Sequence, residues 1–119
     1  MGIGLSESFS LRTSAYPPVF NFMNIKGIFY FDPSDRIYAE HFPGNPVVPG
    51  SLIIHAFLKA LKEEGCSKGY IIENFRFKEF ISPGEYNFDI EICKNQMKCR
   101  LFRSSSDAMK PVVTGIIRK

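Results

Sequence analysis

The stretch EHFPGNPVVPGSLIIHAF, from Glu40 to Phe57, changes character at its midpoint. Its first eleven residues include three prolines and two glycines. That composition disfavours regular structure, because proline lacks an N–H and fixes its own φ while glycine permits tight turns. The residues that follow are mostly apolar and predict a buried helix. We therefore expect a stiff loop that delivers His41 to the first turn of that helix.

The helix is expected to run from Gly50 or Ser51 to Glu64, with Gly65 as its C-terminal stop. Its first half is apolar nearly all round except for His55, so it must be covered on most sides. The N–H groups at its start carry partial positive charge and are suited to hold a developing oxyanion.

The rest of the chain predicts strands. Residues 1–19 read as either an edge strand or a loose arm, and 32–35 as a turn. Strands are expected at 20–31, 36–39 and 112–117, and in several segments after Gly69 where apolar residues alternate with polar ones; a turn is expected at Asn95-Gln96. Mostly successive strands favour antiparallel pairing. The pattern predicts an α+β fold in one domain over residues 1–119, with a sheet of five or six strands around one long helix.

Composition excludes several classes of function. The chain has 119 residues, 45% of them hydrophobic, and a net charge of only +3, which gives nucleic-acid binding no strong support. There is no metal-ligand spacing and no phosphate loop, so no cofactor is expected. No apolar run approaches membrane length, and the three cysteines show no CxxC spacing. We expect a cytoplasmic protein with reduced cysteines.

Two segments carry a family resemblance. HFPGNPVVPGSL, at 41–52, closely resembles the HFPGxPVxPGxL signature of the 3-hydroxyacyl-acyl-carrier-protein dehydratases of fatty-acid synthesis, which have a hotdog fold. ENFRFKEFISPGEYNFDIEI, at 73–92, is similar to the same family's later strand, Pro-Gly turn and strand. The resemblance implies elimination of water from 3-hydroxyacyl thioesters to give trans-2-enoyl thioesters. It also implies an acyl carrier protein as partner.

The resemblance also implies roles for individual residues. His41 matches the base, and an unperturbed imidazole is about three quarters neutral at pH 7. The backbone carbonyl of Val47 matches the group that holds that ring, and the N–H of Gly50 matches the donor to the thioester carbonyl. Substrate contacts are expected at Phe42, Pro49 and Ser51. The alternative for His41 is that it merely caps a turn.

One position departs from the family. Where the family has a glutamate or aspartate that handles the substrate hydroxyl, this chain has His55. Three accounts stay open: His55 acts as the acid, the carboxylate is truly missing, or His55 is a hydrogen-bonded core residue. Family members join the two catalytic residues across a dimer interface. A homodimer, or an assembly of such dimers, would pair His41 with His55 of its neighbour, whereas a heterodimer could supply the carboxylate from a homologous subunit.

Two other hypotheses of function stay open alongside dehydration. A non-catalytic acyl-binding subunit and, less favoured, an acyl thioesterase are the rivals, and the fold hosts both kinds of function. Four cations could face an acidic carrier protein or simply be solvated: Lys59, Lys62, Arg76 and Lys78. Four aromatic residues could line an acyl tunnel or belong to the core: Phe42, Phe57, Phe75 and Phe77. Acyl chain length, carrier protein against coenzyme A, and housekeeping against specialised polyene or polyketide synthesis are left open.

Overall fold

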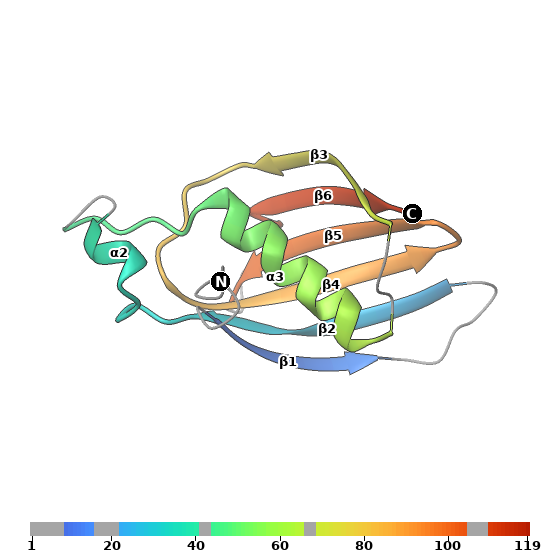
Figure 1. Cartoon of the computed structure of the whole chain (residues 1–119), viewed down its shortest axis with the longest axis horizontal. Helices are drawn as coiled ribbons and strands as arrows, with labels where there is room; N and C mark the ends of the chain where they lie inside the picture. The colour runs from blue at the N-terminus through green and yellow to red at the C-terminus, as the bar shows by residue number, and fades with distance from the viewer. Residues whose placement is uncertain (1–8, 16–21, 41–43, 66–68, 105–109) are drawn as a thin grey trace.

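The computed structural model describes residues 9–15, 22–40, 44–65, 69–104 and 110–119. Six strands form one antiparallel sheet, and a 14-residue helix, α3, lies across one of its faces (Figure 1). The strands are β1 (Phe9–Ala15), β2 (Phe22–Phe31), β3 (Ile71–Phe77), β4 (Gly84–Cys93), β5 (Gln96–Arg103) and β6 (Val113–Arg118). The helices are α2 (Ile37–Glu40) and α3 (Gly50–Glu63). The predicted sheet around one helix is confirmed.

The strand order in the sheet is β1-β2-β4-β5-β6-β3. After β2 the chain passes through both helices and reaches β3 at the far edge, then returns to β4 beside β2 (Figure 1). The long crossing is what carries α3 over the sheet. β1 occupies the other edge, so residues 9–15 form the edge strand that was one of the two expectations for the N-terminal segment.

The core lies between α3 and the facing side of the sheet. Phe29 and Phe88 stack with ring centroids 4.0 Å apart, and Phe57 from α3 meets Phe29 edge-on at 5.2 Å. All three side chains are buried. Offset and edge-on pairs of this kind add to the stabilisation that burial alone gives. Phe57 is therefore a core residue.

Both ends of α3 fall where the sequence predicts. Pro49 has φ −62° and ψ 144°, an extended conformation, and the helix begins at Gly50. At the other end Gly65 has φ +87°, and its N–H donates to the Lys62 carbonyl at 3.0 Å. A glycine with positive φ just past the last turn is the usual helix stop, because it carries no Cβ that would clash there.

The strand predicted at residues 36–39 is wrong, because Ile37–Glu40 is a short helix. Asp32 first closes a turn by accepting from the N–H of Ser34 at 2.9 Å. The carboxylate of Asp35 then accepts from the N–H of Ile37 at 2.9 Å. An aspartate that binds an N–H two residues ahead caps a helix start, and here this local capping overrides the strand pattern.

The β4–β5 turn also lies one residue earlier than predicted. Cys93 pairs with Gln96, which leaves Lys94 and Asn95 as the two loop residues, and Lys94 has φ +56°. A two-residue hairpin needs such positive φ values to match the twist of its strands.

A bulge interrupts β3. Asn74 has φ +51°, and the register against β6 shifts between Glu73 and Arg76. After the bulge Phe77 pairs with the buried Val113, and Arg76 pairs with Thr114, which faces the other side. The alternation predicted for Arg76 and Phe77 is therefore present. Without the extra residue of the bulge, each of these two side chains would face the other side of the sheet. No helix in the described parts of the chain is long and apolar enough to cross a membrane.

Candidate active site

The loop before α3 is tied to the segment that joins β3 and β4. The N–H of Val48 donates to the carbonyl of Ile81 at 2.8 Å. Pro49 then caps the helix, and its carbonyl accepts from the N–H groups of Leu52 at 3.0 Å and Ile53 at 3.2 Å. The N–H groups of Gly50 and Ser51 precede these bonds and have no acceptor inside the helix. They give this end of α3 its partial positive charge.

A cavity of about 280 Å³ adjoins this helix start. Its wall includes three residues that the sequence predicts for the site: Val47, Pro49 and Gly50. The Phe77 ring lies 3.0 Å from where a Cβ on Gly50 would stand. Glycine therefore allows the aromatic ring to approach the first turn of the helix closely. The cavity places an apolar wall beside backbone donors, which is an arrangement suited to an acyl thioester.

The predicted base lies outside the described residues. His41 and Phe42 belong to the short segment between Glu40, where α2 ends, and Gly44. Gly44 has φ +85°, a conformation that favours glycine. The roles expected for His41 and Phe42 remain predictions.

His55 lies on α3, about 7.5 Å along the helix axis from Gly50. Its Nε2 atom is buried. Burial lowers the pKa of His55 below its ordinary value, and the positive charge of Lys59 lowers it further. A neutral imidazole is therefore favoured near pH 7. Among the described residues, neither His55 nor the exposed Ser51 lines the cavity beside Gly50.

The cavity wall also contains residues that the sequence analysis did not assign to the site. Glu79, Phe80 and Ile81 follow β3 and form part of the cavity wall. Glu79 forms an ion pair with Arg103 of β5. The only signal for these residues was their position inside the second family-like segment, which reads as a strand and a turn rather than as a wall. Phe77 was expected either to line a tunnel or to fill the core, and it lines the cavity.

An antiparallel sheet with one helix across its face is the architecture of a hotdog-fold protein. The chain belongs to the ApeI-like dehydratases: residues 21–116 match the model of this family, which is described as ApeI dehydratase.

Curated relatives share sequence with part of the chain. It is 36% identical over 69 residues to the 3-hydroxyacyl-[acyl-carrier-protein] dehydratase FabZ of Caldicellulosiruptor bescii, over 50% of this chain and 49% of that protein. It is 29% identical over 84 residues to FabZ of Herpetosiphon aurantiacus, over 63% of this chain and 59% of that protein. The chain thus spans between 49% and 59% of the length of these relatives.

Solved structures share the fold at low identity. An uncharacterized protein from Erwinia carotovora subsp. atroseptica superposes with a TM-score of 0.73 and 17% identity, over 92% of this chain and 94% of that one. The dehydratase heterocomplex ApeI:P from Xenorhabdus doucetiae superposes with a TM-score of 0.61 and 21% identity, over 92% and 96% of the two chains. At these identities the likeness concerns the fold.

Proposed function

We propose that this chain eliminates water from 3-hydroxyacyl thioesters to give trans-2-enoyl thioesters, with His41 as the base. The observation that carries the proposal is the cavity at the start of α3, where Val47, Pro49 and Gly50 meet in a chain of the dehydratase family. In the sequence, His41 precedes Val47, a residue of this cavity wall, by six positions. The acyl group is proposed to arrive on an acyl carrier protein, the carrier that the name of the FabZ relatives includes.

The chemistry needs three groups. A base takes the proton from the carbon next to the thioester carbonyl, and the electron pair moves toward the carbonyl oxygen. The N–H of Gly50, at the positive end of α3, is the proposed donor to that oxygen. The electrons return to form the double bond as the hydroxyl at C3 leaves, and that hydroxyl must receive a proton.

The third group, the acid that protonates the leaving hydroxyl, has no residue assigned to it by the single chain. His55 stands where the family has a carboxylate, and the lowered pKa of His55 favours a neutral ring in the single chain. A neutral imidazole still donates a hydrogen bond through one N–H, but it is a weaker acid than imidazolium. A nearby negative charge from a second chain would raise the pKa of His55 and favour its charged form.

A site shared between two chains fits these features. His55 does not line the cavity beside Gly50 in its own chain, so a partner is the proposed source of the acid. The partner is either a second copy or a homologous subunit that keeps the carboxylate. The edge strand β3 and the loop after it expose apolar side chains, among them Ile71 at 51% and Phe80 at 87%, which supports an assembly there.

The test follows enoyl product formation from 3-hydroxybutyryl-acyl carrier protein. We expect the purified chain to form the enoyl thioester and His41→Ala to abolish it, while His41→Ala leaves the unfolding transition unchanged. His55→Glu restores the family's carboxylate. A large gain in rate with His55→Glu means that the carboxylate was missing, and a loss means that the imidazole had replaced it. Product formation that survives His41→Ala contradicts the proposed base.

The second candidate is a non-catalytic or partner-dependent subunit. The histidine at position 55 favours it, because an otherwise intact signature lacks one catalytic group. In this case the wild-type chain alone forms no product. Activity then depends on adding a homologous subunit.

A further inference from the structure

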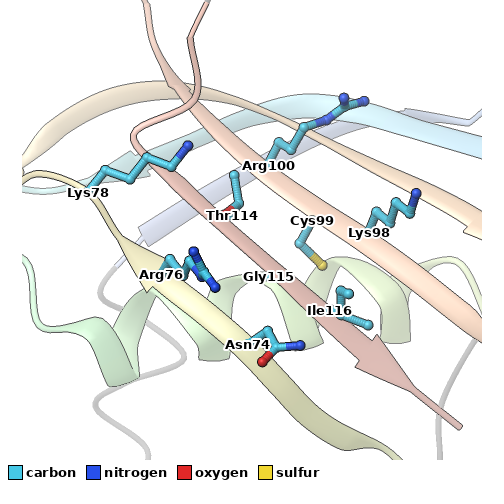
Figure 2. A pocket seen from close by; sticks show the side chains of 9 residues that line it. All are labelled: Asn74, Arg76, Lys78, Lys98, Cys99, Arg100, Thr114, Gly115 and Ile116. Atoms are coloured by element: carbon cyan, nitrogen blue, oxygen red, sulfur yellow. The ribbon is translucent and has the colours of Figure 1, made fainter.

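The face of the sheet opposite α3 carries a groove of about 350 Å³. In Figure 2 the helix lies behind the strands, and the side chains of Arg76 and Lys78 reach from β3 and its end toward β6. Lys98 and Arg100 of β5, Thr114 of β6 and Asn74 of β3 complete the polar lining. Gly115, beside Thr114, contributes no side chain to the floor.

The groove is basic. Among the residues that the structure describes, its lining includes four cations and no carboxylate. Arg100 is already paired, with Asp89 at 2.8 Å and Glu91 at 2.9 Å on the neighbouring strand. Arg76, Lys78 and Lys98 form no ion pair with any residue that the structure describes. Their positive charges are therefore available to a bound anion.

The bulge in β3 creates this arrangement. Without the extra residue at Asn74, the side chains after it would face the opposite sides of the sheet. The guanidinium of Arg76 would then point toward the helix. With the bulge, Arg76 pairs in register with Thr114, which pairs in turn with Arg100. A guanidinium, two ammonium groups and a hydroxyl are thereby gathered across three adjacent strands.

These donors suit phosphate better than a single carboxylate. A guanidinium fork binds two oxygens of a phosphate at once, lysines add point charges, and a hydroxyl donates one further bond. The volume lies within the range of small-molecule sites, and Ile116 adds an apolar surface beside the donors. The groove therefore fits an organic phosphate, in which a charged group is joined to a less polar body.

We propose that this outer groove binds a phosphate ester through Arg76, Lys78, Lys98 and Thr114. The site is distinct from the cavity beside Gly50. Phe77 lines that cavity, whereas its neighbours Arg76 and Lys78 line the groove on the opposite face of the sheet. The proposal does not depend on the dehydration reaction.

The test is calorimetric titration of the full chain with coenzyme A, dephospho-coenzyme A and inorganic pyrophosphate. The variant Arg76→Gln/Lys98→Gln removes two charges from the groove. The matched control Lys26→Gln/Lys110→Gln removes two exposed charges that do not line it. We expect binding to the groove variant to weaken at least about tenfold, as the loss of a charged hydrogen bond implies, while the control stays within about twofold of wild type.

The ligands distinguish the source of the phosphate. Weaker binding of dephospho-coenzyme A than of coenzyme A assigns the groove to the ribose phosphate, and equal binding assigns it to the diphosphate that pyrophosphate mimics. Either result supports the proposal. Arg76→Lys, which keeps the charge and loses the fork, provides a milder variant if the double variant fails to fold. The proposal is overturned by equal weakening in the control, or by failure of all three ligands to saturate wild-type protein at millimolar concentration.

Discussion

The His55 imidazole is the residue whose environment has the most direct consequence for pH. Burial and Lys59 both lower its pKa in the folded chain. The unfolded chain therefore binds a proton there more readily, and the stability that the neutral ring provides is full above its unfolded pKa, near 6.5, and is lost as pH falls below it. We expect the free energy of unfolding to fall less between pH 7 and pH 5 in His55→Gln than in wild type.

Urea unfolding at a series of pH values measures this difference. Lys59→Gln serves as the second variant, because removing the nearby positive charge raises the pKa of His55 toward its ordinary value. The free energy of unfolding of this variant should therefore depend less steeply on pH than that of wild type. Parallel pH curves for wild type and His55→Gln would mean that the ring titrates alike in the folded and unfolded chains.

Gly115 shows a different constraint at the scale of one residue. A Cβ there would stand 2.4 Å from the ring of Phe75, which lies against β6 from the neighbouring strand. Gly115→Ala therefore overpacks a buried position and should cost about 1–3 kcal/mol in the free energy of unfolding. Thermal and urea unfolding measure the loss. Phe75→Leu combined with Gly115→Ala should recover part of it, and equal losses in the single and double variants would contradict a clash with that ring.

Among the elements, α3 was predictable and α2 was not. The bounds of α3 follow from strong local signals, namely Pro49 before an apolar run and Gly65 after it. α2 depends on the Asp35 side chain capping a four-residue turn, a signal easily outweighed by the apolar and aromatic residues at 37–38. The β3 bulge was not predictable either, since it is visible only once the partner strand β6 is placed.

The hydrogen bond from Val48 to Ile81 connects two elements that both shape the cavity. Val48→Pro removes the donor and leaves the Ile81 carbonyl, in a buried residue, without that partner. We expect a loss of about 1–3 kcal/mol in the free energy of unfolding, and faster amide exchange at the start of α3. Val48→Ala keeps the N–H and is the control for the lost side chain. Unchanged exchange in Leu52 and Ile53 in the proline variant would show that the bond does not hold the helix start.

At the scale of the molecule, the sequence predicted the hotdog architecture but not the division of its functional residues. Val47, Pro49 and Gly50 come together because a short loop and a helix start keep them close in any fold. His55 does not join them, because it lies about 7.5 Å further along the helix axis than Gly50. A second chain is proposed to complete the site. The sequence analysis treated four cations as one group: Lys59, Lys62, Arg76 and Lys78. Arg76 and Lys78 lie in a groove with Lys98 and Arg100. This groove is on the face of the sheet opposite α3, the helix that carries Lys59 and Lys62.

The β3 edge is the proposed surface of assembly, and it can be tested apart from catalysis. Ile71 and Ile72 are 51% and 40% exposed there. Ile71→Glu/Ile72→Glu places charge on the edge and should shift the chain from dimer toward monomer in sedimentation equilibrium, with loss of dehydration. Tyr30→Glu changes a 39% exposed residue on β2 and should leave the assembly as it is. A double variant that stays dimeric would exclude this edge as the interface.

Mixing two inactive chains tests whether each site is shared. If His41 of one copy works with His55 of the other, then His41→Ala and His55→Ala are both inactive alone. A mixed dimer nevertheless contains one site with both histidines intact. After random exchange of subunits half the dimers are mixed, so about a quarter of the wild-type rate should return, because the two sites of a twofold dimer are equivalent. The rate is measured after refolding the two variants together, with each refolded alone as the control. A mixture that stays inactive contradicts pairing of the two histidines between copies of this chain, and then a homologous subunit becomes the source of the missing acid.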